Sequence, residues 1–180
     1  MCLPFRRSGL RSVATCHVRR ASPDDADGIA TVLDTVARER VHSAIERAWT
    51  ADEQRRYLAS LSPREAFHVA IAETGEVVGY QSLDLYSTIL PSMAHVAALG
   101  TFLLPAWRRH GVGQALFDAT RQFASLAGYR KFVIQVRASN LSAQAFYTQL
   151  GFVECGRLRA QVIVDGTEDD EVVLEFFLNG

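Results

Sequence analysis

A glycine-rich segment stands where an apolar run ends and an amphipathic helical pattern begins. The run Val96–Leu104 precedes Arg108–Gly113, which reads Arg-Arg-His-Gly-Val-Gly, and apolar residues then recur along one helical stripe until Gly128. Glycine at 111 and 113 lets the backbone approach a ligand closely, and the first turn of a helix offers unpaired amides that favour an anion. The segment therefore predicts a strand, an anion-binding loop and a helix, in that order.

Two other types of glycine-rich loop do not fit this segment. A P-loop needs Lys-Ser or Lys-Thr after its last glycine, whereas Gln114 and Ala115 follow Gly113. A dinucleotide-binding fingerprint needs a third glycine near position 116, where Leu116 stands. A cofactor loop and a plain turn with solvated arginines both remain, and the rest of the chain has to decide between them.

Two motifs in the chain resemble those of the GNAT superfamily of acyl-CoA-dependent N-acetyltransferases. Arg108, Gly111 and Gly113 match the loop pattern Gln/Arg-x-x-Gly-x-Gly/Ala. Residues 140–152 resemble the second motif, Asn-x-x-Ala-x-x-x-Tyr-x-x-x-Gly-Phe. The strand-like run Lys131–Val136 lies between them, so both motifs occur in the order of the superfamily. Their combination is more specific than either motif alone.

The resemblance implies acetyl-CoA as co-substrate, bound across a gap between the fourth and fifth strands, and no metal. Tyr147 matches the tyrosine that hydrogen-bonds the CoA sulfur and acts as general acid, so it is the expected catalytic residue. A core tyrosine and, for Asn140, a helix N-cap are the alternative interpretations. The expected cofactor-binding residues are Phe102, Leu103, Arg108, Arg109, His110, Gly111, Val112, Gly113, Gln114, Asn140 and Tyr147.

The general base is left open by the sequence. Many relatives carry a glutamate on the fourth strand, but the corresponding stretch here, His95–Gly100, contains no acid. His95, with an ordinary pKa near 6.5, and Asp84 are candidates, as are a water chain and an amine that is already neutral. The resemblance implies direct attack of the amine on the thioester, without an acyl-enzyme cysteine.

The acceptor is expected to contact the connection Arg38–Trp49 and the late hairpin near Asp165, as in the superfamily. That connection carries a mixture of charged and aromatic residues that suits a small amino-acid-like amine: Arg40, His42, Glu46 and Trp49. A solvated helix surface offers the same mixture. A protein N-terminal or lysine acetyltransferase and a non-catalytic acyl-CoA-binding module are the alternative functions.

Composition agrees with one globular enzyme domain. The chain has 180 residues, 48% hydrophobic, and a net charge of −1, which gives no electrostatic case for nucleic acid. No apolar run approaches the roughly 18 residues of a membrane span. Cys2, Cys16 and Cys155 lack CxxC spacing, which argues against a disulfide framework or zinc site and favours the cytoplasm. The oligomeric state is open, although homodimers are common in the superfamily.

The order of local patterns predicts a single α/β domain, a GNAT-like mixed sheet flanked by helices, with the order β-α-α-β-β-β-α-β-α-β-β. Ser22-Pro23 and the pair Thr50 and Glu53 are helix-start signals, and Asp165-Gly166 predicts a turn. Residues 1–15, rich in Arg and Ser, are expected to be a disordered extension rather than a transit peptide. Residues 16–180 are the expected N-acetyltransferase domain.

Overall fold

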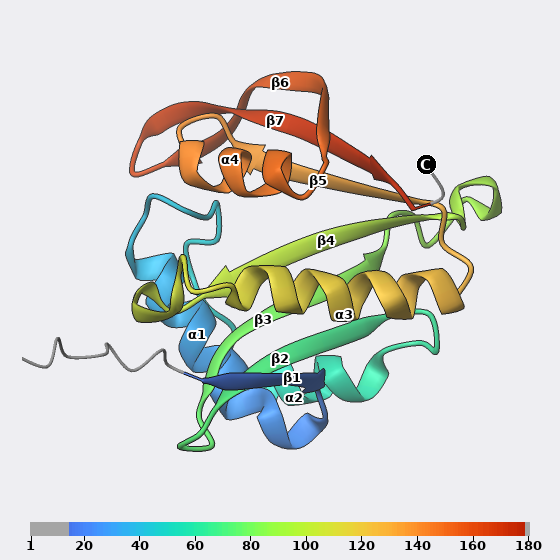
Figure 1. The fold of residues 1–180 in the computed structure, drawn as a ribbon. Coiled ribbons are helices and arrows are strands. Elements are labelled where there is room, and N and C mark those ends of the chain that lie inside the picture. The colour runs from blue at the N-terminus through green and yellow to red at the C-terminus, as the bar shows by residue number, and fades with distance from the viewer. Residues whose placement is uncertain (1–14, 179–180) are drawn as a thin grey trace, which may run out of the picture.

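Between residues 15 and 178, the part of the chain described by the computed structural model, seven strands form one sheet in the order β1-β2-β3-β4-β5-β7-β6 (Figure 1). Residues 1–14, most of the expected N-terminal extension, lie outside this range. The strands are β1 Cys16–Arg20, β2 Ala66–Ala72, β3 Val77–Leu85, β4 Val96–Leu103, β5 Lys131–Arg137, β6 Val153–Val164 and β7 Thr167–Phe177. The helices are α1 Ala26–Arg38, α2 Ala51–Ser60, α3 Val112–Leu126 and α4 Leu141–Gln149. This order confirms the predicted α/β class.

The helix starts follow local sequence signals. At α2 the Thr50 hydroxyl accepts a hydrogen bond from the Glu53 amide at 3.2 Å, and the Glu53 carboxylate accepts one from the Thr50 amide at 2.8 Å. This is the capping box predicted from the spacing of the two residues. Ser22 and Pro23 instead open a short 3-10 turn, Pro23–Asp25, and α1 follows it directly.

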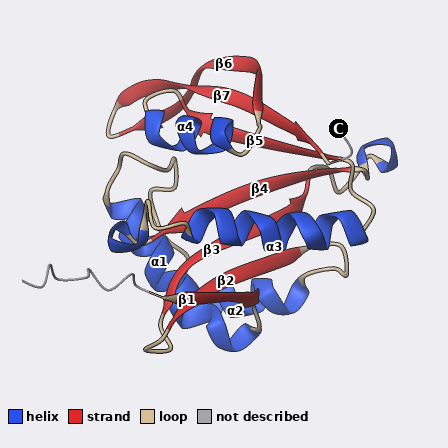
Figure 2. Cartoon of the chain, in the orientation of Figure 1, coloured by secondary structure: helices blue, strands red, loops and turns tan. Residues whose placement is uncertain are grey.

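Helices cover both faces of the sheet (Figure 2). On one face α1 and α2 enclose a core with Phe67 of β2 and Tyr80 of β3. On the other face α3 packs against β1, β2 and β3, and α4 packs against the strands that follow β4. A helical layer on each side is the arrangement that buries both faces of a mixed sheet.

The sheet opens at its centre, between the parallel strands β4 and β5. Their register runs only from Val96 opposite Lys131 to Ala98 opposite Val133. Beyond Ala98, β4 continues to pair with β3 as far as Leu103, and β5 continues to pair with β7 as far as Arg137. The two strands diverge in that direction (Figure 1). The sheet is therefore continuous at one end and split at the other.

The late hairpin is longer than its hydrophobic pattern indicates. The expected turn is present, with positive φ of 50° at Asp165 and 76° at Gly166. However, β7 begins at Thr167 and not at the apolar stretch after Glu171, because the polar residues 168 and 169 pair with Ile163 and Val162 of β6. This part of the hairpin extends beyond the last β5 residue, Arg137, so β6 and β7 keep their backbone pairing there without a core to require apolar alternation.

Candidate active site

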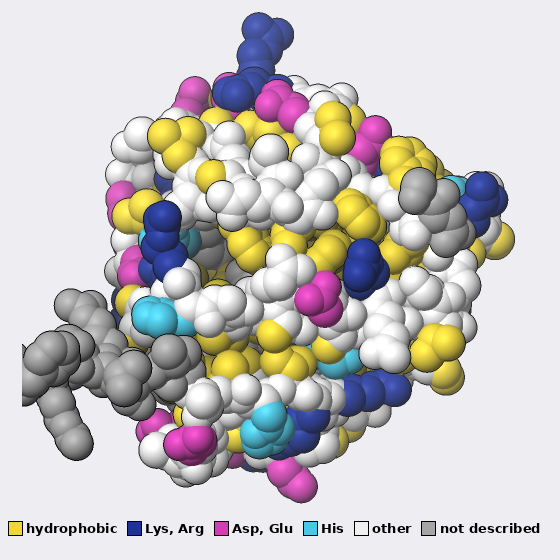
Figure 3. All heavy atoms as spheres, viewed as in Figure 1, with side chains coloured by type: hydrophobic (Ala, Val, Ile, Leu, Met, Phe, Trp, Pro, Cys, Tyr) yellow, Lys and Arg dark blue, Asp and Glu magenta, His cyan; other side chains and the backbone are white. Residues whose placement is uncertain are grey.

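A cavity of about 790 Å³ occupies the split between β4 and β5. Its walls come from β4, β5 and β7, from α4, from the segment before α3, and from the connection between α1 and α2. On the face that carries α3 and α4, Figure 3 shows a hollow in which apolar side chains are visible. Both sequence motifs therefore contribute residues to the lining of the same cavity.

The segment before α3 borders this cavity and carries backbone amides without an acceptor among residues 15–178. Arg109 and Gly111 adopt positive φ, 61° and 81°, and the first amide of α3 with a backbone acceptor is that of Ala115, bonded to the Gly111 carbonyl at 3.0 Å. The amides of residues 111–114 have no acceptor within the described part of the chain. A helix start with free amides is a general anion site, so the residues present fit a diphosphate.

The two glycines of the loop have different physical roles. A Cβ on Gly111 would meet nothing within 4 Å, so glycine is favoured there by the left-handed backbone. A Cβ on Gly113 would lie 2.9 Å from the ring of Phe146 and 3.5 Å from Leu103. Gly113 therefore allows α3 to lie close to α4 across the cavity.

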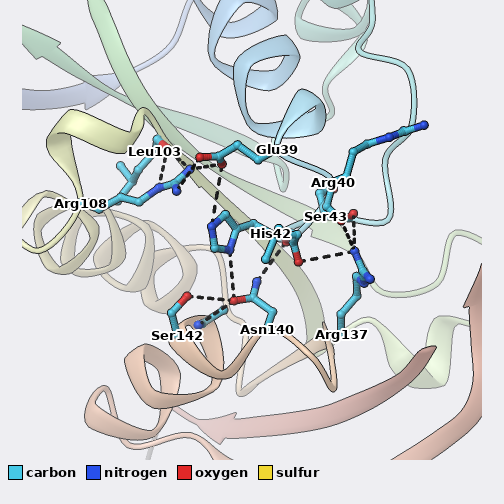
Figure 4. A network of polar contacts seen from close by, with 11 residues as sticks. Glu39, Arg40, His42, Ser43, Leu103, Arg108, Arg137, Asn140 and Ser142 are labelled. Atoms are coloured by element: carbon cyan, nitrogen blue, oxygen red, sulfur yellow. Dashed lines mark hydrogen bonds and ion pairs between the residues drawn. The ribbon is translucent and has the colours of Figure 1, made fainter. Parts of the chain in front are cut away.

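The guanidinium of Arg108 is held by the protein itself. It forms two hydrogen bonds to the Glu39 carboxylate, at 3.0 and 2.6 Å, and two to the Leu103 carbonyl, at 3.1 and 3.0 Å (Figure 4). These contacts tie the residue after α1 to the end of β4. Because Arg108 is used in this way, its guanidinium is not available to a phosphate. Arg109 lines the cavity and has no ion pair among the described residues, so Arg109 and the backbone amides are the groups that a phosphate can contact.

Two residues of the expected loop do not line the cavity. His110 is exposed and its Nδ1 lies 2.7 Å from the Arg108 carbonyl, while the side chain of Val112 is buried in the core under α3. Only the backbone groups of these two residues are therefore available to a ligand in the cavity. Gln114, by contrast, lines the cavity.

The end of β4 presents unpaired backbone groups to the split. The Leu104 amide bonds the Val78 carbonyl on β3, so alternation directs the backbone of Phe102 to β3 and that of Thr101 and Leu103 to the cavity. Because the Leu103 carbonyl already accepts from Arg108, an extended ligand arm can pair with the backbone of Thr101 and with the Leu103 amide, as a further strand would. Phe102 also lines the cavity, and its ring stacks on that of Tyr80 with 5.0 Å between the ring centroids.

The hydroxyl of Tyr147 lies at the inner wall of the cavity. It donates to the Thr101 hydroxyl at 2.8 Å, and that oxygen also accepts from the Gln81 amide at 2.7 Å. Tyr147 is 6% exposed, and burial raises its pKa to about 12. The phenol therefore keeps its proton at neutral pH, as a general acid must, while it also satisfies the core-tyrosine interpretation.

Asn140 caps α4 and also touches the α1–α2 connection. Its Oδ1 accepts from the Ala143 amide at 3.1 Å, and its Nδ2 donates to the His42 carbonyl at 3.1 Å (Figure 4). His42 Nδ1 lies 3.4 Å from the same Oδ1. The N-cap interpretation is confirmed by this geometry, and the side chain lines the cavity as well.

The two sequence candidates for the general base lie away from the cavity. His95 is exposed at the closed end of the β4–β5 pair, where its carbonyl accepts from the Arg130 and Lys131 amides. Asp84 stands opposite Ala98 at the same end, accepts from the Tyr57 hydroxyl, and has its pKa raised by burial. Neither side chain borders the split.

Two side chains of the types that act as general bases do line the split, the imidazole of His42 and the carboxylate of Glu171. In sequence, Glu171 is only the end of an acidic run, and its position follows from strand register, opposite Arg137 on β5. His42 belongs to the expected acceptor segment. From that segment Arg40 instead pairs with Asp165 at 2.9 Å, and Trp49 packs against Tyr57.

Comparison with known proteins identifies the family. The model of the acetyltransferase (GNAT) family matches residues 33–152. The chain therefore belongs to the GNAT family. It is 31% identical over 94 residues to the aminoglycoside N(6')-acetyltransferase type 1 of Klebsiella aerogenes, a match that covers 51% of this chain and 61% of that protein.

Solved structures share the fold. A GNAT superfamily phosphinothricin acetyltransferase from Sinorhizobium meliloti, in complex with acetyl-CoA, superposes with a TM-score of 0.82 at 21% identity, over 91% of this chain and 88% of its own. A ribosomal-protein-alanine N-acetyltransferase from Brucella melitensis gives 0.81 at 20% identity, over 89% and 98%. At these identities the similarity is one of fold.

Residues 15–178 hold no group of three or more His, Cys, Asp or Glu side chains placed for a metal ion. In the same range no helix is long and apolar enough to span a membrane.

Proposed function

We propose that this protein transfers the acetyl group of acetyl-CoA to the primary amine of a small molecule by direct attack. The observation that carries the proposal is that Tyr147 and the free amides at the start of α3 border one cavity. Acetyl-CoA supplies an activated acetyl thioester. The amides of residues 111–114 bind its diphosphate, Thr101 and Leu103 pair with its extended arm, and Tyr147 holds a proton for the departing sulfur.

The small-molecule acceptor is supported by the shape of the site and by the named relatives. The connection between α1 and α2 borders the split and is held to β5, since Arg137 donates to the carbonyls of Arg40 at 2.7 Å and Ser43 at 3.4 Å. A concave pocket walled by several elements favours a small ligand. Two of the similar proteins carry the names of small molecules, an aminoglycoside and phosphinothricin. A homodimer and a cytoplasmic location, in keeping with the free Cys16 and Cys155, complete the proposal.

The test is thermal unfolding followed by a thiol-release assay. Acetyl-CoA at about 100 times its Kd should add about 2.7 kcal/mol to the free energy of unfolding and raise Tm by roughly 5–10 °C. Thiol release with small primary amines should then follow. A Tm increase without thiol release from any amine or peptide would instead identify a non-catalytic acyl-CoA-binding module. No increase at all would refute the cofactor assignment.

A further inference from the structure

Glu171 is the one carboxylate that lines the cavity, and within residues 15–178 its side chain has no hydrogen bond or ion pair. Its nearest acidic neighbour differs in this respect, because Asp169 pairs with Arg137 at 2.9 Å. A half-buried carboxylate without a partner is costly, since the loss of hydration is not compensated. Such a group is therefore an indication of a missing cation.

Strand alternation places Glu171 on the side of the sheet away from α3 and α4. Ile134 and Val136 of β5 belong to the core under α4, together with Val172 and Leu174 of β7. The residues between them, Gln135 and Arg137 on β5 and Glu171 on β7, therefore point to the opposite face. That face meets the α1–α2 connection, because Arg137 donates to three of its carbonyls. Glu171 thus lies on the side of the cavity opposite Tyr147.

The cavity has unpaired charges of opposite sign at its two ends. Beside the start of α3, Arg109 and the free amides offer positive charge for phosphates. The other guanidiniums that line the cavity are used internally, Arg108 by Glu39 and Arg137 by Asp169, which leaves Glu171 on the β7 side uncompensated. Burial and the negative charge of Asp169 both raise the pKa of Glu171. A bound cation would relieve both effects.

From this geometry we infer that Glu171 binds the ammonium group of the acceptor, and that the acceptor is an organic cation without a carboxylate near its amine. The inference rests on the proposed function and narrows its acceptor class. It replaces the amino-acid-like acceptor, because the carboxylate of an amino acid would meet Glu171 and no free cation on this side. Gln135 and His42, which also line the cavity, supply further polar contacts.

The experiment compares matched amines in the presence of saturating CoA, which occupies the site without reacting. The probes are 2-phenylethylamine with phenylalanine and 1,5-diaminopentane with lysine, and the proteins are wild type, Glu171→Gln and Glu175→Gln. Glu175 is the matched control, since it lies on the same strand and face but pairs with Lys131 outside the cavity. The readout is the midpoint of thermal unfolding.

In wild type and in Glu175→Gln, at least one amine at ~10 mM should raise the midpoint by about 3 °C, and its amino-acid counterpart should not. Glu171→Gln should lose this response while it keeps its response to acetyl-CoA, which also shows that it folds. An equal response to the amino acid, a retained amine response in Glu171→Gln, or no amine response in wild type would each overturn the inference. Loss of the acetyl-CoA response in wild type would refute the proposed function instead.

Discussion

Tyr147 is part of the hydrophobic core and is also the proton donor of the proposed mechanism. Its ring packs in the core with Phe146 and Phe152, and its hydroxyl reaches Thr101 on β4. Because burial raises its pKa to about 12, the phenol does not ionise over the pH range in which enzymes are usually assayed. The phenol therefore stays protonated at assay pH, which is the form that the proposed mechanism needs for proton donation to the leaving thiolate.

Replacing Tyr147 by Phe should lower kcat by about 100-fold or more, because the proton donor is lost while the ring packing is kept. The KM for acetyl-CoA should stay within about threefold, since the diphosphate and arm contacts are made by other groups. Steady-state kinetics with both substrates measure the two effects. Tyr129→Phe is the matched control, a buried tyrosine whose hydroxyl donates to the Arg64 carbonyl away from the cavity. Unchanged kcat in Tyr147→Phe would remove it from the mechanism.

At the scale of elements, the contact between α3 and β2 contains a buried histidine. His68 is 6% exposed, its Nδ1 lies 2.9 Å from the Thr120 hydroxyl, and burial lowers its pKa to about 4. The folded state therefore favours the neutral imidazole. The burial of His68 between the helix and the strand is therefore most favourable at pH values above the ordinary histidine pKa of 6.5.

The free energy of unfolding should therefore fall as the pH drops from about 6.5 toward 4. In the unfolded chain His68 binds a proton near pH 6.5, but in the folded state only near pH 4, so the difference reaches about 2 kcal/mol at pH 5. Denaturant unfolding at a series of pH values measures it. His68→Gln should flatten the dependence over this window. His17→Gln, exposed on β1, should leave it unchanged, and a flat wild-type profile would contradict the prediction.

At the scale of the whole molecule, the sheet consists of two halves joined over a short length. Strands β1 to β4 form one half and β5, β7 and β6 the other, and their register across the centre covers three residue pairs. Side chains bridge the open end at several points: Tyr147 donates to Thr101, Asn140 donates to the His42 carbonyl, and Arg137 donates to carbonyls of the α1–α2 connection. A ligand in the split would connect the halves.

Acetyl-CoA should slow backbone hydrogen exchange about tenfold or more at Thr101, Leu103 and residues 111–114, whose amides lack a strand or helix partner at the split, and leave the β1–β2 pair unaffected. Hydrogen exchange with mass spectrometry, with and without acetyl-CoA, measures this. The β1–β2 pair is the internal control, because it lies at the far edge of the sheet. Protection confined to segments outside the split would contradict the placement of the cofactor.

Much of the fold was predictable because its signals are local. The capping box of Thr50 and Glu53, the turn at Asp165 and Gly166, and the loop at Gly111 each depend on residues a few positions apart. The alternation of strand and helix patterns then specified the α/β class, and the two motifs specified the family. Local backbone preferences and side-chain periods are properties of the sequence itself, so the sequence alone determined these features.

Only the tertiary structure decided how charged side chains are used. Arg108 matches a motif, yet its guanidinium is neutralised by Glu39, 69 residues away in the chain. His95 and Asp84 were reasonable bases by sequence, but strand register places them at the closed end of the split. Glu171 reads as part of a solvated acidic run, and register on β7 brings it into the cavity. Pairing between distant charges and strand register depend on long-range contacts, which no local pattern encodes.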